Sequence, residues 1–218
     1  VQTSQNLKTL TCFKAYDVRG ELGVNFDTST AYRIGRAIAH HFEAGPVIIG
    51  RDARETSPEL AVAVSHGVCD GGSSVLDIGL AGTEEMYCAV SEFNATAGIE
   101  VTASHNPINY NGLKIVSSGS RPLDVAKDFQ VIKSLAEASD WVKGSGALNV
   151  TDISSEARTK YVERALGFVS VDLLRPLRIV VNSGNGAAGP TFDAIAIELG
   201  RRGAPVDFIR VHHQPDHT

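Results

Sequence analysis

The sequence predicts an α/β protein with a mixed, mostly parallel sheet, helices on both faces and repeated βαβ-type modules. Two stretches, 47–80 and 178–211, both run from a short apolar segment through a helical segment to a second apolar segment. A strand, a helix and a second strand in that order imply a parallel pair of strands with the helix packed on one face. The composition, 43% hydrophobic and 21% charged over 218 residues, is that of a globular protein with its own core.

Around the start of the first stretch we expect one buried strand between two helices. A helix is expected from Thr30 to Phe42, and Val47–Gly50 predicts a strand because it is apolar and ends at glycine. Ser57 followed by Pro58 predicts a helix with Ser57 as its N-cap and proline at the first helical position. Gly71-Gly72 should end that helix.

Three more strands and a helix follow before the first linker-like segment. Val75–Ile78 predicts the strand that closes the first module, and Ile99–Thr102 and Leu113–Val116 predict strands on either side of a loop. Asp124–Ala138 predicts a helix. Lys143–Gly146 has the composition of a linker.

The second stretch repeats the plan of the first. Arg178–Val181 predicts a strand, and a glycine-rich turn leads into a helix over Ala194–Leu199. Gly200 and Gly203 are expected to stop that helix, and Val206–Val211 predicts the next strand.

The two stretches have equal length and align without a gap, which places Ile48 on Ile179. We therefore expect two domains of similar topology. The first would span residues 1–148. The second would span 149–218, begin with a helix over Glu156–Leu166, and be incomplete.

The densest polar segment, Thr102–Pro107, follows a predicted strand, where open α/β sheets place their ligands. Asn111-Gly112 is a tight-turn signal that would bring Lys114 back along the incoming strand. Ser104, His105 and Lys114 could then face one pocket. The alternative interpretation is an ordinary polar loop.

Two turns carry arginines, whose fork of donors suits phosphate oxygens. Arg19 precedes a glycine turn, and Arg51 and Arg54 follow a buried strand. For the latter two, the alternative is surface ion pairing with Asp52 or Glu55.

The turn Gly184–Gly189 matches G-x-G-x-x-G between a strand and a helix, and Asp207 lies where a ribose-binding acid would sit. A dinucleotide-binding unit is therefore a competing hypothesis. The same glycines would also serve any tight strand-to-helix turn.

Ser104 beside His105 raises the hypothesis of a serine hydrolase. No G-x-S-x-G surrounds it, however, and neighbouring side chains on an extended backbone point to opposite sides. The pairs His40-His41 and His212-His213 lack a third residue at metal-ligand spacing. We interpret both pairs as structural or solvated.

The net charge of −5 gives no electrostatic footprint for nucleic acid, so an anionic substrate would need a local basic cluster. No apolar run approaches membrane-spanning length. Cys12, Cys69 and Cys88 form no CxxC and are expected to be small buried residues in a reducing compartment. We expect a cytoplasmic protein that binds neither nucleic acid nor membrane.

Four motifs, in this order, resemble those of the α-D-phosphohexomutases, and together they cover the chain from about Leu10 onward. They are Lys14–Gly20 (K-A-Y-D-V-R-G), Gly50–Arg54 (G-R-D-A-R), Thr102–Pro107 with Asn111–Lys114 (T-A-S-H-N-P and N-G-L-K), and Asn182–Gly189 (N-S-G-N-G-A-A-G). The last motif accounts for the glycine fingerprint without a dinucleotide.

Within that family, Gly82–Tyr87 and Val211–Asp216 look most like bacterial phosphomannomutases that feed GDP-mannose synthesis. The resemblance implies interconversion of mannose 6-phosphate and mannose 1-phosphate through a phosphoserine and a hexose 1,6-bisphosphate, with Mg²⁺. Phosphoglucomutase, a dehydrogenase fragment and a non-catalytic sugar-phosphate-binding fragment stay open as alternatives.

The resemblance also implies roles for single residues. Ser104 would carry a phosphate that also binds Mg²⁺, and Arg19 and Lys114 would supply a positive field around it. His105 would contact the phosphoserine or the substrate. The substrate phosphate would be bound by Arg51, Thr102 and Asn106. Lys114 would also carry a proton if neighbouring cations favour its neutral form. The family's acidic Mg²⁺ loop, D-G-D-x-D-R, does not occur in these 218 residues. We therefore expect the chain by itself not to turn over sugar phosphate. The oligomeric state is not predicted.

Overall fold

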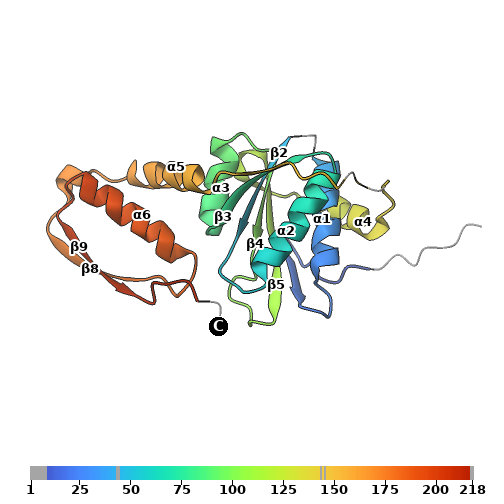
Figure 1. The fold of residues 1–218 in the computed structure, drawn as a ribbon, viewed down its shortest axis with the longest axis horizontal. Coiled ribbons are helices and arrows are strands. Elements are labelled where there is room, and N and C mark those ends of the chain that lie inside the picture. Colours follow the sequence, from blue (N-terminus) through green and yellow to red (C-terminus); the bar gives the residue numbers. More distant parts are fainter. Residues whose placement is uncertain (1–8, 43–44, 143, 145, 217–218) are drawn as a thin grey trace, which may run out of the picture.

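The computed structural model describes residues 9–42, 45–142, 144 and 146–216 (Figure 1). In chain order its strands and longer helices are β1 (Val18–Glu21), α1 (Thr28–His41), β2 (Pro46–Arg51), α2 (Ser57–Asp70), β3 (Ser74–Leu80), α3 (Thr83–Glu92), β4 (Ala97–Val101), β5 (Tyr110–Ser117), β6 (Arg121–Pro122), α4 (Gln130–Ala138), β7 (Val150–Asp152), α5 (Ser154–Leu166), β8 (Leu177–Asn182), α6 (Ala188–Arg201) and β9 (Val206–Val211). Short helical turns lie at Ser118–Ser120, Val125–Phe129 and Val171–Leu173.

The main sheet has the strand order β1-β5-β4-β2-β3-β7, with β6 paired to β5. Strand β2 runs parallel to both β3 and β4, and β3 runs parallel to β7. Strand β5 is antiparallel to β1, β4 and β6. Strands β8 and β9 form a separate parallel pair. The expected mixed, mostly parallel α/β fold is confirmed.

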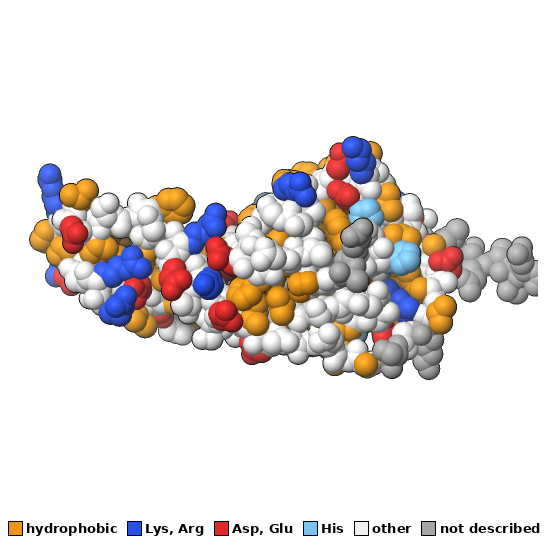
Figure 2. Space-filling model, turned by 90° about the horizontal axis from the view of Figure 1, so that it is seen from above, with side chains coloured by type: hydrophobic (Ala, Val, Ile, Leu, Met, Phe, Trp, Pro, Cys, Tyr) orange, Lys and Arg blue, Asp and Glu red, His pale blue; other side chains and the backbone are white. Residues whose placement is uncertain are grey.

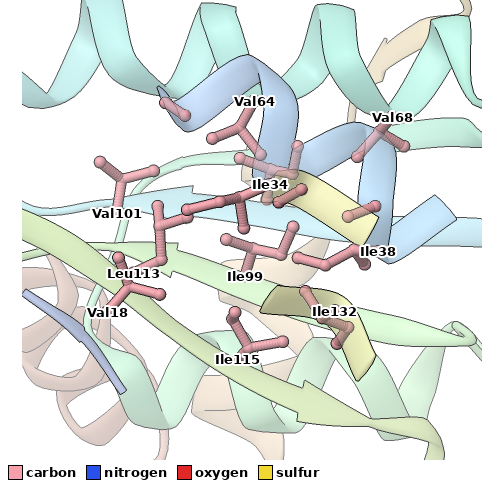
Figure 3. Close-up of a cluster of buried hydrophobic side chains, with 14 of the residues drawn as sticks. Val18, Ile34, Ile38, Val64, Val68, Ile99, Val101, Leu113, Ile115 and Ile132 are labelled. Carbon is pink, nitrogen blue, oxygen red and sulfur yellow. The ribbon is translucent and has the colours of Figure 1, made fainter. Parts of the chain in front are cut away.

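Helices cover both faces of the main sheet. On one face, side chains of β4 and β5 meet α1, α2 and α4 in the larger core, and Figure 3 shows this contact for Ile99, Val101, Leu113, Ile115, Ile34, Ile38, Val64, Val68 and Ile132. On the other face, Ile48 and Ile78 pack with Met86 and Val90 of α3 and with Ala157 of α5. The alternation along each strand follows from the two-residue period of a β-strand.

The two βαβ modules, β2-α2-β3 and β8-α6-β9, correspond closely. Strands β2 and β8 both have six residues, helices α2 and α6 both have 14, and the gap-free alignment superimposes their bounds. At the carboxyl ends of the strands the pairing agrees, because Gly50↔Gly79 corresponds to Val181↔Arg210. At the amino ends it differs by one residue, because β2 and β3 shift register between Ile49 and Gly50.

Three local expectations were wrong. The N-cap of α2 is Thr56, and Ser57 is the first helical residue, because its hydroxyl is used inside the fold instead. Helix α6 begins at Ala188, six positions before the expected start at Ala194, and continues through Gly200 to Arg201. Gly203, in the left-handed conformation with φ of 75°, follows its end.

Other expected elements agree within a few residues, and α4 is preceded by one turn of π-helix over Val125–Phe129. The three cysteines are buried, as expected. Of the linker-like segment, Lys143 and Ser145 lie outside the described residues. The domain boundary near residue 149 stays a prediction.

Helix α5 joins the two modules, because it packs against α3 and β3 on one side and α6 on the other (Figure 1). The buried Glu85 carboxylate of α3 accepts hydrogen bonds from Thr191 of α6 at 2.7 Å and from Arg158 of α5 at 3.3 Å.

Seen from above, side chains of both charge signs intermingle over the α5–α6 lobe (Figure 2). No helix within the described residues has the length and apolar character needed to cross a membrane.

Candidate functional site

The loop between β4 and β5 presents Ser104 and His105 to solvent. Ser104 has φ of 55°, a left-handed conformation that costs a non-glycine residue on the order of 1–3 kcal/mol. Its hydroxyl lies 3.3 Å from Nδ1 of His105. The expectation that these neighbours point to opposite sides was therefore wrong, because it assumed an extended backbone at Ser104.

Arg54, after β2, holds this loop in place. Its guanidinium donates hydrogen bonds to four backbone carbonyl oxygens of the loop, those of Ser104 (3.2 Å), Asn106 (2.5 Å), Pro107 (2.8 Å) and Tyr110 (3.1 Å). A planar fork of donors can satisfy several carbonyls at once. The strained conformation at Ser104 is thus stabilised by a side chain distant in sequence.

A polar network sets the position of Arg54. The Asp52 carboxylate lies 3.5 Å from Nε of Arg54 and accepts hydrogen bonds from its backbone N–H and from the Ser57 hydroxyl. Ser57, fully buried, accepts in turn from Nδ2 of Asn111 at the start of β5. The G-R-D-A-R turn and Asn111 therefore meet behind the Ser104 loop. The expected tight turn at Asn111-Gly112 was wrong, because both residues lie inside β5.

Arg19 supports the loop from β1. Its buried guanidinium donates to the carbonyl oxygens of Val18 and Thr102, both at 2.8 Å, and forms an ion pair with Asp17 at 3.2 Å. The Thr102 hydroxyl accepts the backbone N–H of Ser104 at 2.9 Å. Gly112 makes room for this arrangement, since a Cβ there would lie 2.8 Å from Arg19 Nη1. Burial lowers the pKa of Arg19, and the nearby Asp17 opposes that effect.

Lys114 lies on the same face of the sheet as Thr102 and Arg19. It pairs directly with Glu100 across β4 and β5, two residues along each strand from the pair formed by Thr102 and Gly112. Residues opposite each other, or two apart, share a face of a sheet. The structure therefore gathers Ser104, His105, Arg19, Thr102 and Lys114 at one edge of the sheet.

Two other predicted site residues have partners within the fold. Arg51 lies 3.7 Å from Asp77 of β3. The Asn106 amide donates to the carbonyl oxygen of Ala103 at 2.9 Å. Their roles in binding a substrate phosphate stay predictions. Arg54, rather than Arg51, is the arginine of that turn that contacts the Ser104 loop, and its spacing in the sequence gave no means of choosing between them.

The glycines of the turn after β8 are required by the local backbone conformation and packing. Gly184 has φ of 58°, and a Cβ on Gly189 would lie 2.0 Å from the carbonyl oxygen of His213. The His213 ring lies between Asp193 (2.8 Å) and Ser183 (3.3 Å), which confirms its structural role. Close packing of the chain on itself therefore explains this turn without a dinucleotide.

No group of three or more His, Cys, Asp or Glu side chains that could hold a metal ion is present among the described residues. The described residues therefore offer Mg²⁺ no cluster of carboxylates.

Comparisons with known proteins show what the chain is similar to. A family model described as "Phosphoglucomutase/phosphomannomutase, alpha/beta/alpha domain I" matches residues 10–141. A phosphomannomutase of Salmonella montevideo is 45% identical over 212 residues, which are 97% of this chain and 46% of that protein. A protein of Xanthomonas campestris pv. campestris named "Phosphohexose mutases" is 40% identical over 208 residues, 95% of this chain and 45% of its own length.

Among solved structures, a phosphoglucomutase/phosphomannomutase family protein from Burkholderia thailandensis matches with a TM-score of 0.77 and 32% identity. The match covers 94% of this chain and 44% of that one. The chain thus spans about half the length of the curated relatives it matches.

Proposed function

The chain belongs to the phosphoglucomutase/phosphomannomutase family, and on that premise we propose that it forms the phosphoserine-bearing part of a sugar-phosphate mutase. Ser104 carries the phosphoryl group, and the favoured substrates are mannose 6-phosphate and mannose 1-phosphate. The observation that carries the proposal is the exposed, left-handed Ser104 on a loop whose carbonyls are held by Arg54 and Arg19. The names of the similar proteins support the choice of mannose.

In the proposed reaction, phosphorus leaves Oγ of Ser104 as it bonds to a sugar hydroxyl oxygen, which gives a hexose 1,6-bisphosphate. The hydroxyl proton passes to Lys114, the proposed proton carrier, and from Lys114 to Oγ of Ser104. The second half-reaction reverses these steps at the other phosphate. Phosphoryl transfer depends mainly on position and charge, which suits a rigid loop beside Arg19 and His105.

Mg²⁺ is proposed as the cofactor because the family resemblance implies it. When bound, it would neutralise charge on the transferred phosphoryl group. The chain's own contribution is the geometry of Ser104 and the positive charges around it.

The proposal is tested by intact mass and turnover of the full-length gene product. We expect one phosphoryl group on the protein, located at Ser104 by peptide mapping. Ser104→Ala should remove it and lower mutase turnover by orders of magnitude. Ser118→Ala, a change of another exposed serine just after β5, is the matched control and should retain both. Normal turnover in Ser104→Ala would overturn the assignment.

Substrate preference is measured in the same assay with mannose and glucose phosphates. Preference for glucose would replace the phosphomannomutase assignment with phosphoglucomutase and leave the role of Ser104 intact. A coupled assay of the 218-residue chain tests the separate expectation that it does not turn over sugar phosphate alone.

A further inference from the structure

Asn111 has a fully buried side chain at the start of β5, where the Ser104 loop rejoins the sheet. Its amide nitrogen donates to the hydroxyl oxygens of Thr56 at 2.9 Å and Ser57 at 3.0 Å, and its amide oxygen accepts the backbone N–H of Gly112 at 2.8 Å. The amide can lie only this way round, because the reverse orientation would set its NH₂ group against the N–H of Gly112. Asn111 is therefore a fixed hydrogen-bond donor toward the start of α2.

The direction of donation continues from Ser57 to Asp52. Ser57 is also fully buried, and because its hydroxyl oxygen accepts from Asn111, its single hydrogen is left to donate. That hydrogen goes to Oδ1 of Asp52, at 2.5 Å. The Asp52 carboxylate, which can only accept, also receives the backbone N–H of Arg54 at 3.0 Å and lies 3.5 Å from its Nε. Four side chains thus form one directed series of contacts from β5 to the turn after β2.

This series ends on the loop from which it starts. Arg54 donates to the carbonyl oxygens of Ser104 and of Tyr110, and Asn111 directly follows Tyr110. The contacts therefore close a ring through the loop, the first turn of α2 and the turn after β2. Hydrogen bonds that share partners in this way are coupled, so removing one changes the geometry of the others. The position of the Arg54 guanidinium, and with it the left-handed backbone of Ser104, should depend on a donor at position 111.

We propose that Asn111 is a positioning residue of the phosphoserine site, which acts on Ser104 through Ser57, Asp52 and Arg54. The inference rests on the proposed function. Because its side chain is fully buried, Asn111 touches neither substrate nor phosphate. It fixes the arginine that holds the backbone from which Oγ of Ser104 projects. Phosphoryl transfer depends on the position of that oxygen, so loss of the donor should slow transfer without weakening substrate binding.

The first test needs no catalysis and uses this chain. Asn111→Asp keeps the size of the side chain but replaces its donor with a carboxylate oxygen, so the Ser57 hydroxyl faces two carboxylates. The ¹³Cα and ¹³Cβ signals of Ser104, which report its backbone conformation, should shift away from their parent positions. Asn109→Asp makes the same chemical change at an exposed asparagine of the loop whose amide bonds to Glu21, and as the matched control it should leave these signals in place. Unshifted Ser104 signals in Asn111→Asp would overturn the inference.

The second test is the kinetics of the full-length gene product. Asn111→Asp should lower kcat by about 10- to 100-fold and change KM less than about threefold, as expected when a reacting group is misplaced. In an Arg54→Met background the same change should lower kcat no further, because both residues act through one guanidinium. A purely structural residue would instead add its own loss to that of Arg54→Met, and that result would overturn the inference. If Asn111→Asp fails to fold, Ser57→Ala is judged by the same criteria.

Failure of the inference and failure of the proposed function are distinguishable. A full-length gene product without phosphate on Ser104 would contradict the proposed function, even where Asn111→Asp shifts the Ser104 signals of the chain. A phosphorylated and active gene product whose kcat is unchanged by Asn111→Asp would contradict this inference and leave the proposed function intact.

Discussion

The two βαβ modules share their order of elements, the lengths of their first strand and helix, and their parallel pairing, yet they differ sharply in burial. In the first module, Ile48 is fully buried, because β2 lies between β3 and β4 and helices cover both faces of the sheet. Its counterpart Ile179 is 38% exposed, and within the described residues β8 pairs with β9. The same local pattern therefore produces a core strand in one place and a partly exposed strand in another.

The turn after the first strand differs in a way that bears on function. In the first module, Arg54 reaches across to the Ser104 loop. The aligned position in the second module is Asn185, whose amide donates to the carbonyl oxygen of Gln214 at 2.8 Å. Both residues hold a neighbouring segment by its carbonyls, but only arginine can hold several at once. The comparison teaches that a repeated scaffold acquires its role through the residues of this turn.

The largest expected effect comes from truncating the aligned core residues. Ile48→Ala should lower the free energy of unfolding by about 2–5 kcal/mol, because it leaves a cavity in a packed core. Ile179→Ala should cost less than about 1 kcal/mol, because the side chain is partly exposed. Urea unfolding followed by circular dichroism and by the single tryptophan, Trp141, which packs on the first module, gives both values. Equal losses would contradict the difference in burial.

The next effect compares the two turns. Arg54→Met should destabilise the chain by about 1.5–3 kcal/mol, because it removes hydrogen bonds from a charged donor to several carbonyls. Asn185→Ala removes one exposed hydrogen bond and should cost about 0.5–1 kcal/mol. Amide hydrogen exchange should become faster in residues 103–110 of Arg54→Met and stay unchanged there in Asn185→Ala. Unchanged exchange there would mean that Arg54 does not hold the Ser104 loop.

The third prediction concerns the pH dependence of stability at Glu100 in β4. Burial raises the pKa of Glu100 in the folded chain above its unfolded value. The stability that depends on Glu100 is therefore fully present below the unfolded pKa and is lost as pH rises through the folded pKa. As pH rises above the unfolded pKa, the stability of Glu100→Gln relative to the parent chain should therefore increase, until pH passes the folded pKa. A difference that does not vary with pH would exclude titration of Glu100 as its source.

The smallest expected effect is on the stability of the second module. Its dependence on pH is opposite in direction to that expected from Glu100. Hydrogen bonds from His213 and Arg210 lower the pKa of Asp193. The resulting stability is present above the unfolded pKa of about 3.9 and is lost as pH falls through the folded value. Asp193→Asn should cost about 0.2–1 kcal/mol near neutral pH, because the pair is exposed. The cost should vanish in acid, and a cost that persists there would point to packing instead.

Much of the fold could be predicted because its signals are local. The apolar segment Val47–Gly50 and the proline at position 58 marked β2 and the start of α2 to within a residue. The gap-free alignment extended the same order to β8, α6 and β9. Strand β1 and helix α3 were not predicted as elements, because neither has a long period of apolar residues. Such segments depend on tertiary packing for their structure.

The candidate site, likewise, could be predicted only in part. Ser104, His105 and Lys114 were predicted from a polar loop between two strands, and the antiparallel register of β4 and β5 brings Lys114 beside that loop. The conformation of Ser104 could not be predicted, because left-handed backbone at a serine is disfavoured locally and is held by distant groups.

By itself, then, the sequence determined the elements, the parallel module, its repeat and the polar loop with Ser104, because turn residues and apolar periods act over a few positions. Only the tertiary structure decided that Arg54 rather than Arg51 holds the loop, that Gly50 opens a space for Glu100, and that Ile48 is buried while Ile179 is not. Each of these depends on which strands become neighbours. Hydrogen bonding, desolvation and charge act between groups that are close in space, whatever their distance along the chain.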